Sequence, residues 1–109
     1  MTATKKNDNL KQVKEMSAFI KEKFKAKNVI LFGSYAYGTP TEHSDVDMMV
    51  IMKTKGKTHH KAADIKIALN HKFGMLFPMD LLVRTPEEIK ERVKYDSFIK
   101  EVMENGKEI

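Results

Sequence analysis

The segment from Ser44 to Met52 constrains the fold more than any other part of this sequence. Its start is polar, and its interior is apolar at successive positions. Successive side chains of a strand point to opposite faces of a sheet, so this run predicts a strand that is buried on both faces. Such a strand lies inside a sheet that other elements cover.

Shorter patterns on either side supply those other elements. Apolar residues spaced three and four apart predict amphipathic helices, and the short β-branched runs predict strands. A Thr85-Pro86-Glu87-Glu88 capping box predicts the start of the last helix, and Gly106 its end. The predicted elements are helix 9–25, strand 28–32, strand 44–52, helix 60–73, strand 78–83 and helix 86–105. This order predicts an α+β (α/β) fold, a small mixed sheet packed by helices.

Length and composition limit the class of protein. We expect one domain, because the chain has 109 residues, of which 41% are hydrophobic and 32% charged. No stretch approaches the roughly 20 apolar residues of a membrane-spanning helix, and residues 1–9 do not resemble a secretory signal. The absence of cysteine excludes disulfides, thiolate metal sites and cysteine nucleophiles. We expect a cytoplasmic protein.

The net charge of +5 is concentrated near the start of the chain, where residues 1–28 hold eight lysines and three acids. A basic patch can attract nucleic acid, nucleotide phosphates or an acidic partner. The alternative is a solvated helix face that keeps a small protein soluble. The second interpretation is favoured, because the chain has only two arginines, and readers of phosphates and bases usually carry more.

Three aspartates are the main candidates for a chemical site. Asp45 and Asp47 are two residues apart at a strand start, so their carboxylates project from one face. Two unpaired carboxylates repel each other, and Mg²⁺ is the natural cation to hold between them. Asp80 can join them if its strand lies beside theirs. Three acids at one sheet edge are typical of two-metal phosphoryl or nucleotidyl transfer. Taken alone, Asp45 also fits a turn or cap residue, and Asp80 a salt-bridged acid at a strand end.

Gly33 and Ser34 favour the chemical interpretation of these acids. They follow the predicted strand 28–32 and precede a short helix, a turn whose backbone N–H groups suit an anion. Glycine lets a phosphate approach the chain closely, and the Ser34 hydroxyl can donate a hydrogen bond to a phosphate oxygen. The segment is not a P-loop, because no lysine follows in the required place.

Gly33-Ser34, ten further residues and then Asp45-Val46-Asp47 resemble the signature of the DNA polymerase beta-like nucleotidyltransferase superfamily. The string from Leu31 to Gly38 is similar to its minimal nucleotidyltransferase (MNT) branch. Asp80 matches the third acid of the signature in position and strand context. The resemblance covers roughly residues 28–83, and it implies the nucleotidyltransferase fold over a single domain, residues 1–109.

The resemblance also implies roles for these residues. Asp45 and Asp47 would bind two Mg²⁺ ions at the triphosphate of a nucleotide, and the expected nucleotide is ATP. Asp80 would ligate the metal nearer the attacking hydroxyl and help to deprotonate it, while Gly33 and Ser34 would hold the β- and γ-phosphates. The branch is often paired with a helical HEPN-type partner, which implies an antitoxin that adenylylates a toxin tyrosine. A partner or a homodimer would complete the site of so short a chain.

Other interpretations stay open at this point. The chain could be a binding module that neutralises a partner protein by contact, although such a module would not need three clustered acids. A nucleic-acid-binding domain has less support, because no recognition motif is present. Relatives often carry arginine where Tyr35 or Tyr37 stands. Lysines 53, 55 and 57 could supply that positive charge, although a solvated loop is favoured. The histidines form no zinc pattern.

Overall fold

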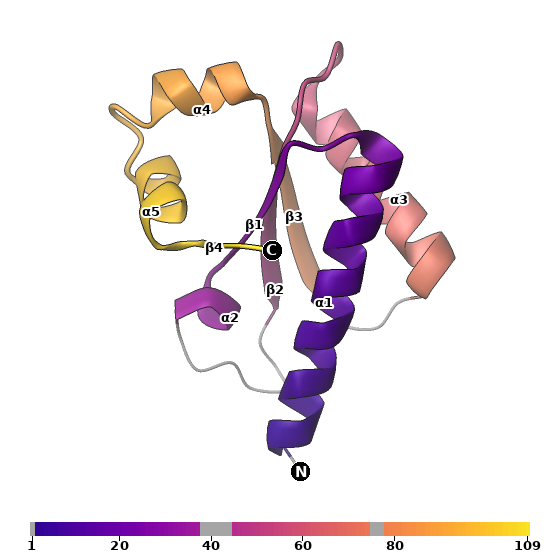
Figure 1. The fold of residues 1–109 in the computed structure, drawn as a ribbon. Coiled ribbons are helices and arrows are strands. Elements are labelled where there is room, and N and C mark those ends of the chain that lie inside the picture. Colours follow the sequence, from indigo (N-terminus) through magenta and orange to yellow (C-terminus); the bar gives the residue numbers. More distant parts are fainter. Residues whose placement is uncertain (1, 38–44, 75–77) are drawn as a thin grey trace.

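The computed structural model describes residues 2–37, 45–74 and 78–109, and for residues 2–9 and 37 it describes the backbone alone (Figure 1). Its centre is a four-stranded sheet in the order β3-β2-β1-β4. The strands are β1 (Asn28–Phe32), β2 (Val46–Ile51), β3 (Met79–Arg84) and β4 (Lys107–Glu108). β2 pairs with β1 antiparallel and with β3 parallel, and β4 pairs with β1 antiparallel. The sheet is therefore mixed, and the predicted fold class is confirmed.

Helices cover both faces of this sheet (Figure 1). α1 (Thr2–Phe24) and α3 (Thr58–Phe73) pack on one face, while α4 (Pro86–Arg92) and α5 (Ser97–Asn105) pack on the other. β2 contributes Met48 to the first core and Met49 to the second, and both side chains are 0% exposed. The prediction that this strand is buried on both faces is confirmed.

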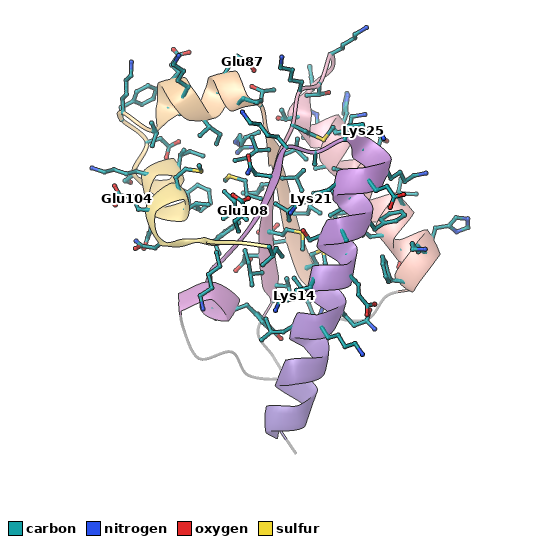
Figure 2. All side chains as sticks on the ribbon, in the orientation of Figure 1. Lys14, Lys21, Lys25, Glu87, Glu104 and Glu108 are labelled. Carbon is teal, nitrogen blue, oxygen red and sulfur yellow. The ribbon has the colours of Figure 1, made fainter. Side chains whose placement is uncertain are left out.

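The lysines of α1 lie where a solvated face would put them. Lys11, Lys14 and Lys23 are exposed, whereas Val13 and Ile20 on the other side of the helix are fully buried. Figure 2 labels Lys14 and Lys21 on α1 and Lys25 directly after its end. Lys21 is an exception to the solvated face, because its ammonium group donates a hydrogen bond to the carbonyl of Ile109. None of the helices in the described part of the chain is both long and apolar enough to span a membrane.

The last predicted helix is two helices, so the prediction of one helix over residues 86–105 was wrong. The capping box at Thr85 and Glu88 is present, with backbone–side chain distances of 3.0 and 3.1 Å, and it starts α4. α4 ends at Arg92. The carboxylate of Asp96 then accepts hydrogen bonds from the N–H groups of Phe98 and Ile99 and starts α5. A second N-cap inside the apolar pattern therefore breaks the helix.

β4 has only two residues and no sequence pattern that would predict it. Gly106 ends α5, as predicted, and it also passes close to β1. A Cβ atom at this position would lie 2.4 Å from the carbonyl oxygen of Val102 and 2.6 Å from Cγ2 of Ile30. The absence of a side chain lets the chain reach β1, where the N–H of Ile109 donates to the carbonyl of Val29 at 2.9 Å.

Candidate active site

Asp47 occupies the second position of β2, where the sheet places it opposite Phe32, the last residue of β1. Gly33 follows immediately and has a φ of +73°. A Cβ atom at Gly33 would lie only 2.2 Å from Oδ2 of Asp47. The carboxylate therefore rests against the backbone of Gly33, in space that a side chain would fill. Gly33 was predicted to let a phosphate approach the backbone. Its contact with Asp47 was not predicted, because it depends on the pairing of β1 with β2.

Asp80 joins Asp47 from the other side. β2 and β3 are parallel neighbours, and Asp47 and Asp80 are directly opposite each other in the register. Opposite residues of paired strands direct their side chains to the same face of the sheet. Asp80 was expected to join Asp47 if its strand lay beside the strand of Asp47, and β3 does lie beside β2.

Asp45 lies two residues before Asp47, just outside β2, and its side chain is exposed. The pKa of Asp47 is raised above its ordinary value, first by burial and then by the negative charges of Asp80 and Asp45. Both neighbours are thus within electrostatic range of Asp47. The structure brings the three predicted acids to one end of β2 and β3.

This cluster has the chemistry of a site for a hard divalent cation. Its donors are carboxylate oxygens, which Mg²⁺ prefers. Burial and, after it, the repulsion from Asp80 and Asp45 raise the pKa of Asp47, and a bound cation would offset both effects. Among the described residues, no three His, Cys, Asp or Glu side chains already stand as ligands around one point. The residues fit a cation, and the two Mg²⁺ ions inferred from the resemblance stay a prediction.

Ser34 is the first residue of α2 (Ser34–Tyr37), a single turn that begins beside Asp47. The carbonyl of Gly33 accepts a hydrogen bond from the N–H of Ala36 at 3.0 Å, which closes this turn. The structure thus places Gly33 and Ser34 at the same end of the sheet as the acids. Ser44, the first residue of the predicted strand 44–52, lies outside the described residues.

The basic loop after β2 is at the other end of the molecule. Lysines 53, 55 and 57 follow Ile51, which lies four positions after Asp47 along β2, a distance of about 13 Å. Figure 1 shows the β2–α3 loop at the top of the view and α2 at the bottom. These lysines therefore do not supply positive charge to the acid cluster of their own chain, and that interpretation was wrong.

The protein thus has a small mixed sheet, with a glycine-serine turn and three acids at one end of it. Comparison with known families gives the same class: the family model for the nucleotidyltransferase domain matches residues 13–109. The chain belongs to this family, and the resemblance seen in the sequence is confirmed. The protein is therefore a nucleotidyltransferase.

Two relatives, both from Methanocaldococcus jannaschii, match most of the chain. One is named "Putative protein adenylyltransferase MJ0141" and is 38% identical over 96 residues, which cover 88% of this chain and 89% of the relative. The other is named "Putative protein adenylyltransferase MJ0604" and is 30% identical over 99 residues, which cover 89% and 93% of the two chains.

Proposed function

We propose that this nucleotidyltransferase is a Mg²⁺-dependent protein adenylyltransferase, which transfers AMP from ATP to a hydroxyl group of an acceptor protein. The observation that carries the proposal is the register of Asp47 with Asp80 on neighbouring parallel strands, with Asp45 two residues away. Carboxylates at one end of the sheet repel the negative charge of a nucleotide triphosphate. They can bind it only through cations that lie between the two. The names of the two relatives support a protein acceptor.

Each residue of the candidate site has a role in this proposal. Asp45, Asp47 and Asp80 hold the metal, which when bound neutralises phosphate charge and makes the leaving pyrophosphate more stable. The carboxylate of Asp80 accepts the proton of the attacking hydroxyl. Ser34 donates its hydroxyl hydrogen to a phosphate oxygen, and Gly33 lets that phosphate approach the backbone.

The acceptor in this proposal is a tyrosine of a HEPN-type toxin, so the protein acts as an antitoxin. The resemblance to the MNT branch supports this partner, because members of the branch are often encoded beside such a protein. The phenol oxygen of the tyrosine attacks the α-phosphorus of ATP, the bond from that phosphorus to the bridging oxygen breaks, and pyrophosphate leaves. The phenol proton goes to Asp80.

The test uses ATP labelled at the α-phosphate, Mg²⁺ and the purified protein, with and without a HEPN-type protein from the same genome. We expect label on the partner, and none in EDTA. The double variant Asp45→Asn, Asp47→Asn should reduce transfer more than about 100-fold, because it removes metal ligands. Its matched control is Glu101→Gln, Glu104→Gln, which removes two exposed acids of α5.

Full transfer by the aspartate variant would show that the assigned site is wrong. A stable complex of the wild-type protein with its partner, with no label in any condition, would replace the proposed reaction by neutralisation through contact.

A further inference from the structure

A pocket of about 440 Å³ lies at the end of the molecule opposite the three acids. The loop after β2 forms one wall and the start of α3 forms another. Phe24, at the end of α1, closes a third side. The volume is within the range of about 300–1,000 Å³ that small-molecule sites occupy. The pocket is thus large enough for one compact ligand.

Positive charge dominates the lining of this pocket. It includes four lysines, at positions 53, 55, 57 and 61, and one acid, Asp64, which leaves an excess of three positive charges. In the described part of the chain none of these four ammonium groups forms an ion pair. Four cations that line one cavity repel each other, and a multivalent anion would relieve that repulsion.

The start of α3 adds to the same field. α3 has 16 residues, and its N-cap residue, Lys57, gives no side-chain acceptor to the first turn. The positive end of the helix dipole therefore has no carboxylate or hydroxyl from the N-cap to offset it. The N-terminus of α3 and the lysines both favour an anion in this pocket. A phosphate group fits better than a carboxylate, because a phosphate carries more charge and more acceptor oxygens.

Phe24 and Met52 add apolar side chains to the lining, beside the polar Thr54 and His60. Met52 is 5% exposed, and the ammonium group of Lys61 lies 5.9 Å from the centroid of the Phe24 ring. An aromatic ring and a methionine beside four cations can take the flat apolar part of a ligand whose other part is anionic. A nucleotide has both parts: its base would lie on Phe24 and Met52, and its phosphates among the lysines.

We propose that this basic pocket binds nucleoside phosphates without a metal, either as free nucleotide or as a nucleotide of single-stranded RNA. It is separate from the candidate active site, because the length of β2 lies between them. The proposal does not depend on the transfer reaction, and it would stand if the acceptor or the chemistry of that reaction proved different. An acidic protein segment is the competing occupant.

The test is done in EDTA at low salt, where the three acids have no metal with which to hold a nucleotide. ATP, a short oligouridylate and an oligoglutamate peptide are titrated separately into the uniformly ¹⁵N-labelled full chain. We expect backbone amide shifts centred on residues 52–61, from ATP, from the oligouridylate or from both. The arm that gives the tighter binding identifies free nucleotide or RNA as the source of the phosphate.

The double variant Lys53→Ala, Lys57→Ala should weaken this binding about tenfold, because it removes two charged hydrogen-bond donors. The matched control is Lys94→Ala, Lys100→Ala, which removes the same charge from exposed positions on the α4–α5 side of the molecule. If the first variant is unstable, Lys55→Glu in the exposed loop makes the same test. The proposal fails if the two double variants lose affinity equally, if the shifts centre on Gly33 and Asp47, or if only oligoglutamate binds.

Discussion

At the scale of single residues, Asp47 is the meeting point of the candidate site. Its carboxylate lies against Gly33, and its partner in the strand register is Asp80. Burial, and after it the charges of Asp80 and Asp45, raise the pKa of Asp47. Two features require glycine at position 33. Its φ is +73°, and a side chain there would occupy the place of the Asp47 carboxylate.

Three glycine-to-alanine variants separate these two requirements. Gly33→Ala has both the unfavourable φ and the contact with Asp47, and Gly74→Ala has an unfavourable φ of +77° with nothing within 4 Å. Gly56→Ala has neither. We expect Gly74→Ala to lose about 1–2 kcal/mol of stability, Gly33→Ala to lose more, and Gly56→Ala to lose little. Urea unfolding and the labelled-transfer assay measure this. Only Gly33→Ala should abolish transfer, and an active Gly33→Ala variant would contradict the role of Asp47.

The raised pKa of Asp47 predicts how stability depends on pH in EDTA. The folded protein keeps the Asp47 proton to higher pH than the unfolded chain does. The contribution of Asp47 to the free energy of unfolding is therefore most favourable below about pH 4, and it falls as pH rises through the raised pKa. Asp47→Asn cannot ionise and should lack this decline. Its thermal midpoint should exceed that of the wild type at neutral pH. Thermal unfolding at several pH values tests this, with Glu101→Gln as the control that should keep the decline.

At the scale of elements, N-caps determine where the last two helices begin. α4 begins with the reciprocal hydrogen bonds of Thr85 and Glu88, and α5 begins with Asp96. Both helices are short, with seven and nine residues, and their caps satisfy N–H groups that would otherwise have no partner within the helix.

Thr85→Ala should destabilise the protein by about 1 kcal/mol, because it removes the acceptor for the N–H of Glu88. For a domain of this size, that corresponds to a fall of about 4–8 °C in the thermal midpoint. Ser97→Ala, at an exposed position in the first turn of α5, is the matched control and should change the midpoint little. Transfer activity at a temperature well below the midpoint should be the same in both variants, since neither residue belongs to the candidate site.

Elements with strong local patterns could be predicted from the sequence, and elements that depend on distant contacts could not. The residues of β1 were predicted correctly, and β2 was predicted from its consecutive apolar residues. The break at Asp96 was missed, although Val93 and Ile99 are six residues apart, a spacing that does not keep them on one helix face. β4 was missed because only the approach of Gly106 to Ile30 forms it. The acids were found by their spacing, whereas the contact of Asp47 with Gly33 needed the strand register.

At the scale of the whole molecule, one sheet separates two cores. Ile65 of α3 lies in the first core and Ile99 of α5 in the second, and both are almost fully buried. β2 takes part in both cores, through Met48 and Met49. The two helix layers are therefore coupled through a shared strand, and the single domain over residues 1–109 stays a prediction.

Ile65→Val and Ile99→Val test this coupling, and each should cost about 1 kcal/mol of stability. The residues lie on opposite faces of the sheet, so the double variant should lose close to the sum of the two single losses. Urea unfolding followed by two probes, one sensitive to helix and one to tertiary packing, should give a single transition in all variants. Two separate transitions, each shifted by one variant only, would show that the two faces fold as independent units.

The loop around Gly56 divides the candidate site between two halves of the chain. A break there would leave Asp45 and Asp47 on the first fragment and Asp80 on the second, with β2 and β3 no longer joined through α3. Neither fragment carries all three acids, so neither fragment alone should catalyse nucleotidyl transfer. Two such fragments fused to a pair of interacting proteins would form a complementation reporter, in which nucleotidyl transfer appears only when the pair meets.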